Sequence, residues 1–491
     1  MRIVQICAEF APIAKAGGMG EVLLGLTQEL RSQGYDVEVL IPKYDFLDLN
    51  ELKHLSVDLA DVRCQENGQT VSNVVWSALY DDCPLFLLDA LHPSGYFHRE
   101  KIYGYEDDTA RFLYFCKAIL EYLVAKGKPI DILHLHDWHA AACAIFLRDF
   151  FAQKLKVRSV LLTVHNFEYQ GRCATWDLDA LGLDGKSYCI PAKLQDPDPR
   201  YSKVLNLLKG GILYADAVNT VSPSYATESI APKGGYGLSS ILKKRKFLGI
   251  LNGIDTKRWN PKTDPYLEAH YWGDQPSPTI QMQKKANKKA LQQLGLESLD
   301  HPLFGVVSRL MPNKGSALLQ QCIAKILAEG GSFVLIGSSP DPAVQKQFDQ
   351  LKEDYKNHPN VMLCYQYEDL LAHRIYAACD FLLVPSLIEP CGLTQLIALR
   401  YGAIPVVRCT GGLKDTVFDC EDSSIPSEKR NGLLFHEPTK EALEAAISRA
   451  VGLWTTQSPL LQLAQKRAMQ ADYGWKKGVK EYIKLYQSLL V

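Results

Sequence analysis

The stretch IVQICAEFAPIAKAGGMGEVLLGLTQELRSQG, residues 3–34, holds an apolar run, a glycine-rich loop and a helical pattern in that order. Residues 3–8 are apolar and predict a β-strand. Apolar side chains then recur at helical spacing until Gly34, at Val22, Leu23, Leu26 and Leu30. The glycines therefore lie where a strand is followed by a helix.

The loop between strand and helix, KAGGMG at residues 15–20, predicts an anion-binding site. Glycines let the backbone approach a ligand closely, and the start of a helix offers unpaired N–H groups and about half a positive charge. Lys15 adds a full charge beside Gly17 and Gly18. Packing alone is the alternative interpretation of these glycines. The dinucleotide fingerprint G-x-G-x-x-G is not met, because Leu23 occupies its third glycine position, and this disfavours a nicotinamide-dependent enzyme.

Length and charge narrow the class of protein. A chain of 491 residues with 47% hydrophobic side chains can fill two or three cores, and two large domains are expected. The 54 Lys and Arg balance 55 Asp and Glu, so no net charge attracts nucleic acid or an anionic membrane. The 13 cysteines include no C-x-x-C pair and are expected to be reduced thiols. The chain begins with a core strand and has no membrane-spanning apolar run, so we expect a cytoplasmic protein.

Short β-branched runs alternate with helical patterns along the whole chain. The runs are residues 37–41, 132–135, 160–164, 217–221, 303–308, 333–336, 381–384 and 404–407. Such alternation is typical of α/β domains with parallel sheets and helices on both faces. Residues 259–278 lack periodicity and separate the first four runs from the last four. We therefore predict two doubly wound domains, residues 1–247 and 248–470, facing a deep cleft, with a C-terminal helix over 471–491 packing on the first domain.

A second anion site is predicted in the second domain, at SRLMPNKG, residues 308–315. This segment follows a predicted strand and precedes a helical pattern. Arg309 presents a planar fork suited to phosphate oxygens, and Lys314 presents a compact point charge. Solvated surface charges are the alternative interpretation. Together with Lys15 in the first domain, the pair favours a diphosphate bound by both domains.

A carboxylate lies in a similar position after the run 381–384. Glu389 is followed by three amides at the start of a helix, those of Gly392, Leu393 and Thr394. Such amides bind an anion while a carboxylate accepts hydrogen bonds from hydroxyl groups, and a sugar phosphate ester carries both groups. The alternative is an acid that only stabilises its own helix. A further glycine loop at residues 410–413 repeats the pattern after the next strand.

His134 and His136 form a His-x-His pattern at a strand end, which is a known metal-ligand pattern, and His139 follows them. No later cluster of His, Asp and Glu completes a metal site, so we predict none. We expect His134 and His139 to be buried histidines bonded to the backbone. Asp137 and His165, each just past a strand, are expected to reach into the cleft as polar contacts.

These motifs together resemble one family, the bacterial glycogen synthases and plant starch synthases, which are retaining glycosyltransferases. The resemblance spans nearly the whole chain and rests on blocks at residues 15–18, 136–139, 163–166, 169–171, 251–255, 308–310, 389–395 and 410–413. It implies the two-Rossmann-domain glycosyltransferase architecture, GT-B. It also implies that the glucan acceptor binds mainly to the N-terminal domain and the nucleotide-sugar donor mainly to the C-terminal domain.

The resemblance implies roles for individual residues. Donor binding is implied for Lys15, Gly17, Gly18, Asn252, Arg309, Lys314, Tyr367, Gly392, Leu393 and Thr394, with Tyr367 stacking on adenine. Catalytic roles are implied for Asp137, His165, Arg309, Lys314 and Glu389, with Glu389 holding the donor glucose and His165 beside the reacting sugar. The family usually has leucine and aspartate where this chain has Met19 and Glu21. The longer acid leaves the donor base and the acceptor preference open.

The reaction implied by the resemblance transfers glucose from ADP-glucose to the 4-hydroxyl at the non-reducing end of an α-1,4-glucan, keeping the α configuration. It needs neither a metal nor a cofactor, because Lys15, Arg309 and Lys314 would stabilise the leaving diphosphate. Three alternatives stay open. They are a related transferase using UDP-glucose or a small acceptor, a metal-dependent hydrolase built on His134 and His136, and a glucan-binding protein without activity. Neither nucleic acid nor a membrane is an expected partner.

Overall fold

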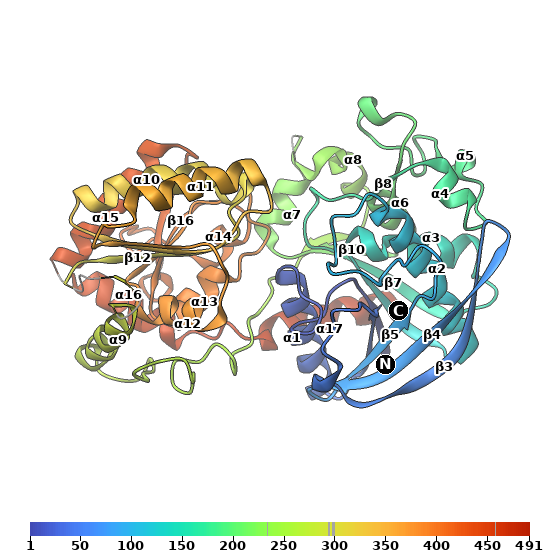
Figure 1. Ribbon diagram of the computed structural model, residues 1–491, viewed down its shortest axis with the longest axis horizontal. Coiled ribbons are helices and arrows are strands. Elements are labelled where there is room, and N and C mark those ends of the chain that lie inside the picture. Colours follow the sequence, from blue (N-terminus) through green and yellow to red (C-terminus); the bar gives the residue numbers. More distant parts are fainter. Residues whose placement is uncertain (233, 293–294, 297–299, 457) are drawn as a thin grey trace. The chain divides into compact units, whose positions relative to one another are not determined.

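The structure is a computed structural model that describes residues 1–232, 234–292, 295–296, 300–456 and 458–491. The chain divides into two compact units. Unit 1 comprises Met1–Gly253 together with Trp475–Val491, and unit 2 comprises Ile254–Gly474 (Figure 1). The chain therefore leaves unit 1 once, after Gly253, and returns to it at Trp475.

Unit 1 is built on a nine-stranded sheet with the order β11-β10-β7-β6-β1-β2-β5-β4-β3. The strands in that order are Phe247–Gly249, Ala217–Thr220, Val157–Val164, Ile130–His136, Arg2–Ile6, Asp36–Pro42, Cys83–Asp89, Gln69–Tyr80 and Lys53–Glu66. All pairs from β11 to β5 are parallel, whereas β4 pairs antiparallel with both β5 and β3. The sheet is therefore predominantly parallel, as predicted, and carries an antiparallel pair, β4 and β3, at one edge.

Helices α1 (Gly18–Ser32) and α17 (Trp475–Leu490) pack together against this sheet (Figure 1). Their apolar side chains form one buried cluster with strand residues such as Ile3, Ile132 and Leu161. The other α-helices described in unit 1 are α2 (Asp108–Lys126), α3 (Asp137–Asp149), α4 (Thr175–Asp179), α5 (Gly185–Tyr188), α6 (Leu207–Tyr214), α7 (Pro223–Ile230) and α8 (Ser239–Leu242). A short pair, β8 (Arg172–Cys173) and β9 (Leu205–Asn206), forms a separate antiparallel sheet.

Unit 2 is built on a six-stranded sheet with the order β14-β13-β12-β15-β16-β17, and all its pairs are parallel. The strands in that order are Val361–Cys364, Ser332–Ile336, Leu303–Val307, Phe381–Val384, Ile404–Arg408 and Leu433–Phe435. Alternate residues of one strand enter two different cores: Leu303 and Val307 pack in one, Phe304 and Val306 in the other. Burial on both faces explains why these strands are continuously apolar in sequence.

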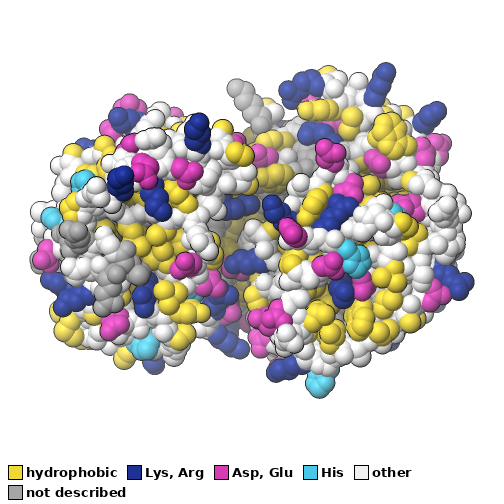
Figure 2. Space-filling view, in the orientation of Figure 1, with side chains coloured by type: hydrophobic (Ala, Val, Ile, Leu, Met, Phe, Trp, Pro, Cys, Tyr) yellow, Lys and Arg dark blue, Asp and Glu magenta, His cyan; other side chains and the backbone are white. Residues whose placement is uncertain are grey.

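Helices cover both cores of unit 2. One core contains side chains of α12 (Asp369–Ala378) and α13 (Thr394–Arg400), and the other contains side chains of α10 (Ser316–Ala328) and α15 (Lys440–Thr455). The remaining α-helices described in unit 2 are α9 (Ser277–Gln292), α11 (Pro342–Tyr355), α14 (Gly411–Thr416) and α16 (Pro459–Gln470). On the face drawn in Figure 2, basic and acidic side chains are interspersed over each unit. Within the described residues, no helix is both long and apolar enough to cross a membrane.

Each sheet has a topological switch point, where the chain leaves a strand to one side and later returns on the other. In unit 1 the switch lies between β1 and β6, and in unit 2 it lies between β12 and β15. Ligands of open α/β sheets bind beyond the carboxyl ends of the strands at such points. Lys15 and Asp137 follow β1 and β6, and Lys314 and Glu389 follow β12 and β15. The predicted site residues thus flank the two switch points.

Candidate active site

The loops after β12 and β15 are tied together at the switch point of unit 2. The amides of Leu387 and Ile388 both donate to the carbonyl of Asn313, at 2.8 and 3.2 Å. Gly315 has φ +75°, and a Cβ there would lie 2.2 Å from the carbonyl oxygen of Pro385. Only glycine permits this close approach with positive φ. The backbone therefore fixes the loop that carries Lys314 against the loop that carries Glu389.

The side chains of Lys314 and Glu389 form an ion pair across these loops. Nζ of Lys314 lies 2.7 Å from each carboxylate oxygen of Glu389. Ser386 donates a further hydrogen bond to Oε2 of Glu389 at 2.8 Å, and Glu389 is 6% exposed. A buried carboxylate with three such contacts is fixed in orientation. The structure brings these two predicted site residues together, and it adds Ser386, which the sequence analysis missed.

A third loop, after β16, holds the backbone of Glu389. The amide of Gly412 donates to the carbonyl of Glu389 at 3.0 Å. Gly411 has φ +45°, and a Cβ there would lie 2.0 Å from the same carbonyl oxygen. The predicted amides of Gly392, Leu393 and Thr394 lie just beyond, where α13 begins at Thr394. The glycine loop at 410–413 therefore supports Glu389 through its backbone.

Arg309 and Tyr367 are the other predicted residues of unit 2. Arg309 is exposed in the loop after β12. Tyr367 is 49% exposed, and its hydroxyl donates to Asp369 Oδ1 at 3.1 Å. Asp369 also accepts a hydrogen bond from Arg258 at 2.7 Å. The Tyr367 ring is thus anchored at its hydroxyl end, with about half of the side chain accessible.

The glycine loop of unit 1 already binds a carboxyl group of the protein itself. The amides of Ala16 and Gly17 both donate to Oε2 of Glu9 at 2.9 Å. Tyr103 donates to the other oxygen, Oε1, also at 2.9 Å, and Glu9 is 4% exposed. The amides of Ala16 and Gly17, which precede the first residue of α1, are therefore engaged within the protein. A buried acid directly after an apolar strand was the signal in the sequence that could have identified Glu9.

Lys15 of the same loop pairs with Glu21 at the start of α1. Its Nζ lies 2.6 Å from Oε1 of Glu21, and the two side chains are 31% and 24% exposed. Glu21 is the residue at which the family resemblance leads us to expect an aspartate. The longer side chain therefore contacts the lysine to which donor binding was assigned. Gly18 is the first residue of α1 and is exposed.

Asp137 and His165 lie together at the carboxyl ends of β6 and β7. Oδ1 of Asp137 accepts from the amide of His165 at 2.6 Å. Asp137 has φ +58°, an uncommon conformation for a residue with a Cβ and one that is enriched at functional sites. Burial, reinforced by the nearby charge of Glu9, raises the pKa of Asp137 to about 7. Burial lowers the pKa of His165 to about 3, so its imidazole is neutral at pH 7.

His134 and His136 are buried, but their partners are side chains rather than backbone groups. His134 contacts the hydroxyls of Thr163 and Tyr486 at 2.6 and 2.9 Å. His136 contacts His165 at 3.1 Å and Gln5 at 3.2 Å. The prediction of backbone bonding is wrong for His134. Because both nitrogens of each ring are engaged, neither ring has a nitrogen left for a metal, and the described residues contain no group of three or more metal-ligating side chains.

His139 and Asn252 are buried side chains with an unsatisfied atom. His139 packs against the rings of Tyr103 and Trp138, and its Nδ1 has no hydrogen-bond partner in the described part of the chain. The expected backbone bond of this ring is therefore wrong as well. Asn252, close to the end of the first segment of unit 1, is 7% exposed, and its Oδ1 likewise lacks a partner among the described residues.

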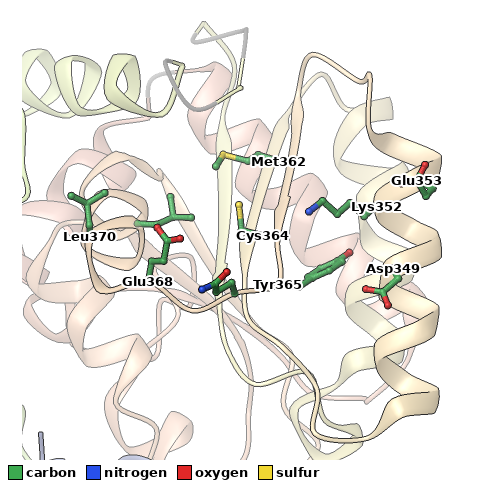
Figure 3. A pocket seen from close by; sticks show the side chains of 10 residues that line it. Asp349, Lys352, Glu353, Met362, Cys364, Tyr365, Glu368 and Leu370 are labelled. Atoms are coloured by element: carbon green, nitrogen blue, oxygen red, sulfur yellow. The ribbon is translucent and has the colours of Figure 1, made fainter. Parts of the chain in front are cut away.

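A cavity of about 770 Å³ lies at the edge strand β14 of unit 2 (Figure 3). Its lining includes Lys352 and Glu353 of α11, Cys364 at the end of β14, Tyr365 just after it, and Leu370 of α12. The predicted site residues are not part of this lining. The cavity is therefore distinct from the loops at the switch point of unit 2.

Comparison with known proteins places this geometry in a family. Residues 2–244 match the family model of the starch synthase catalytic domain, and residues 301–452 match that of glycosyl transferases group 1. The glycogen synthase of Protochlamydia amoebophila (strain UWE25) is 41% identical over 100% of this chain and 99% of its own length. This chain belongs to the glycogen synthase and starch synthase family. It is therefore a glycosyltransferase, and the resemblance seen in the sequence is confirmed.

Members of this family from plants are similar to the chain as well. The probable starch synthase 4 of Arabidopsis thaliana is 40% identical over 99% of this chain, which corresponds to 46% of that longer protein. The solved catalytic domain of starch synthase IV from Arabidopsis thaliana, bound to ADP and acarbose, aligns with a TM-score of 0.94 and 39% identity over 99% of both chains. The predicted GT-B fold of the family is confirmed.

Proposed function

We propose that the protein transfers glucose from ADP-glucose to the non-reducing 4-hydroxyl of an α-1,4-glucan, with retention of configuration. The observation that carries the proposal is the Lys314–Glu389 pair at the switch point of unit 2. It presents a fixed carboxylate, suited to sugar hydroxyls, next to a cation suited to phosphate. The solved relative bound to ADP and acarbose, a nucleoside diphosphate and a glucan-like sugar, supports the same substrate classes.

Residues of unit 2 are proposed to bind the donor. Lys314 directs two of its three N–H groups to Glu389 and keeps one for a phosphate oxygen. Arg309 and the amides of Gly392, Leu393 and Thr394 would share the diphosphate, and Tyr367 would stack on the base. These groups stabilise the charge that grows on the leaving diphosphate, so they act more strongly in the transition state than in the ground state.

Residues of unit 1 are proposed to contact the donor diphosphate and the reacting sugar. Lys15 would exchange its contact with Glu21 for a phosphate oxygen. This exchange costs little free energy because the Lys15 side chain is partly exposed. Gly17 and Gly18 let the backbone approach the donor, and Asn252 offers a buried oxygen that still lacks a partner among the described residues. Asp137 and His165 would contact sugar hydroxyls.

Retention is proposed to proceed without a covalent intermediate on the enzyme. A retaining glycosidase uses a carboxylate nucleophile opposite a second carboxyl group. Glu389 is bound by Lys314 and Ser386, and Asp137 has a pKa of about 7 and is only half ionised at that pH. Neither is suited to act as the nucleophile. The bond to the diphosphate would break on the face where the acceptor hydroxyl attacks, and the leaving phosphate would take the proton of that hydroxyl.

The test is a donor comparison with the purified protein. Glycogen and EDTA are mixed with ADP-glucose or with UDP-glucose, and nucleoside diphosphate release is measured together with elongation of the glucan. We expect elongation chiefly from ADP-glucose and no loss of rate with EDTA. Elongation chiefly from UDP-glucose would keep the mechanism and reject the donor, and no transfer from either would reject the proposal.

A further inference from the structure

A chain of buried hydrogen bonds connects helix α1 to His165. The hydroxyl of Thr27 contacts the carbonyl of Leu23 at 2.7 Å, and Nε2 of Gln5 contacts the Thr27 oxygen at 2.9 Å. Oε1 of Gln5 lies 3.2 Å from Nε2 of His136, and Nδ1 of His136 lies 3.1 Å from Nε2 of His165. Gln5, Thr27 and His136 are fully buried, whereas His165 is partly exposed.

The donor and acceptor of each of these hydrogen bonds follow from the first bond, that between Thr27 and the carbonyl of Leu23. The Leu23 carbonyl can only accept, so the single hydroxyl proton of Thr27 is donated to it. The Thr27 oxygen therefore accepts from the amide NH₂ of Gln5, and this orients the amide so that its carbonyl oxygen faces His136. Since that oxygen can only accept, Nε2 of His136 must carry a proton.

The imidazoles of His136 and His165 are both neutral, so each ring carries one N–H proton. Burial lowers the pKa of His136 well below its usual range and lowers that of His165 to about 3. With its proton on Nε2, His136 has a lone pair on Nδ1 and accepts a hydrogen bond there. The donor is Nε2 of His165, which leaves Nδ1 of His165 without a proton.

We propose that Thr27, Gln5 and His136 are positioning residues that hold His165 as the Nε2–H tautomer, with Nδ1 as a hydrogen-bond acceptor for a hydroxyl of the transferred sugar. The tautomer follows from the directions of the hydrogen bonds between neutral rings, and only the identity of the hydroxyl rests on the proposed function. The arrangement favours a sugar with a hydroxyl at the contacted carbon, because a lone pair cannot pair with the hydrogen of a deoxy sugar.

A second chain of hydrogen bonds on the same strand supplies a matched control. Thr163 donates to Asn219 Oδ1 at 2.6 Å, so its oxygen accepts from Nε2 of His134, and the hydroxyl of Tyr486 donates to Nδ1 of His134. These bonds end on His134, which has no hydrogen bond to His165. Tyr486→Phe therefore removes one buried hydroxyl that contacts His134 without altering the bonds that fix His165.

The test is ¹⁵N NMR of the full-length protein labelled at histidine, in which ring shifts and two-bond proton couplings distinguish the Nε2–H and Nδ1–H tautomers. The His165 signals are assigned by their loss in His165→Gln. We expect Nε2–H in the unmodified protein, in Thr27→Ser and in Tyr486→Phe. In Thr27→Val the Gln5 amide is free to turn its NH₂ group toward His136, and the Nδ1–H form of His165 should gain population. Gln5→Leu interrupts the hydrogen-bond chain at a different residue and should also increase the population of the Nδ1–H form of His165.

Kinetics supply a second measurement. We expect kcat/KM for ADP-glucose to fall about 10-fold in Thr27→Val, the scale of one hydrogen bond, and to recover in Thr27→Ser. One donor analogue lacking a single sugar hydroxyl should be penalised by the unmodified protein and not by Thr27→Val. A purely structural role of Thr27 would instead lower the rate for all analogues alike.

Two results would overturn the proposal. One is an Nδ1–H tautomer of His165 in the unmodified protein, and the other is an unchanged tautomer in both Thr27→Val and Gln5→Leu. The outcome is separable from that of the proposed function. If the tautomer responds as expected while the unmodified protein transfers no glucose, the positioning role stands and the proposed reaction falls.

Discussion

Lys314 is proposed to contact two acidic groups, the carboxyl group of Glu389 and the diphosphate of the donor. Its ammonium group holds Glu389 and is proposed to stabilise the leaving diphosphate. We expect Lys314→Ala to lose turnover by roughly 10²-fold or more, the scale for one preorganised charge stabiliser. The measurement is the steady-state rate of diphosphate release, with folding checked by circular dichroism.

Lys325 provides the control for that substitution. It lies in the last turn of α10 and pairs with Glu329, just past the end of that helix, and both side chains are nearly a third exposed. Lys325→Ala should therefore keep near-normal turnover, since surface pairs contribute little. Near-normal turnover in a folded Lys314→Ala protein would contradict the role assigned to Lys314.

Asp137 makes the stability of the protein depend on pH. Its pKa is about 7 in the folded chain against an ordinary value of 3.8. The unfolded chain loses this proton near pH 4 and the folded chain only near pH 7, so the contribution of Asp137 to stability is complete below pH 4 and is lost as pH rises through 7. Asp137→Asn removes this dependence and can still accept from the amide of His165.

We therefore expect Asp137→Asn to raise the urea midpoint more at pH 8 than at pH 5. The gain at pH 8 is at most about 4 kcal/mol, from a shift of about 3 pKa units at 1.36 kcal/mol each. Activity should fall in the same variant if Asp137 contacts the sugar. An equal change of the midpoint at both pH values would show that the carboxyl is not destabilised by its surroundings.

At the scale of elements, the close contact between α1 and α17 requires glycine at position 25 of α1. A Cβ on Gly25 would lie 2.0 Å from Nε1 of Trp475. In an ordinary helix, alanine is favoured over glycine by about 1 kcal/mol. We expect the opposite sign here: Gly25→Ala should lower the melting temperature of unit 1, because the methyl group displaces Trp475.

Gly452 of α15 is the matched control. A Cβ at this position meets no described atom within 4 Å. Gly452→Ala should follow helix propensity and stabilise unit 2 by about 1 kcal/mol. Thermal unfolding of the two variants by calorimetry checks both signs. A stabilising Gly25→Ala would mean that α17 does not pack on α1 as described.

Elements differed in how well the sequence predicted them. The strands of unit 2 were predictable because burial on both faces makes them continuously apolar. The β3–β4 hairpin was missed because its strands alternate polar and apolar residues, although Asn67 and Gly68, with φ of +49° and +74°, form the turn typical of hairpins. The residues of the candidate site were found through motifs, whereas their partners Glu9, Gln5 and Ser386 come from distant segments or carry no motif of their own.

At the scale of the whole molecule, unit 2 is one continuous segment and unit 1 is not. Both cores of unit 2 consist of residues within 254–474. We expect the isolated segment 254–474 to fold and to unfold cooperatively on heating. A disordered spectrum from this segment would show that unit 2 depends on unit 1.

Removal of α17, by contrast, should destabilise unit 1. A chain of residues 1–474 lacks five buried members of the unit 1 cluster, among them Trp475, Tyr482 and Tyr486. Exposure of the matching face of α1 and the sheet should make unit 1 sensitive to protease while unit 2 stays resistant. Equal resistance of both units would contradict the role of α17 in that core.

The return of the chain to unit 1 at Trp475 also sets an order for events on the ribosome. Unit 2 can be completed once residue 474 has emerged, whereas unit 1, although synthesised first, waits for residues 475–490 to cover its sheet. During translation of the intervening 221 residues, from 254 to 474, the apolar surface that α17 later covers is open to other proteins in the cell. The half of the molecule made first is thus the last to mature, and chaperone contacts of the nascent chain should concentrate there.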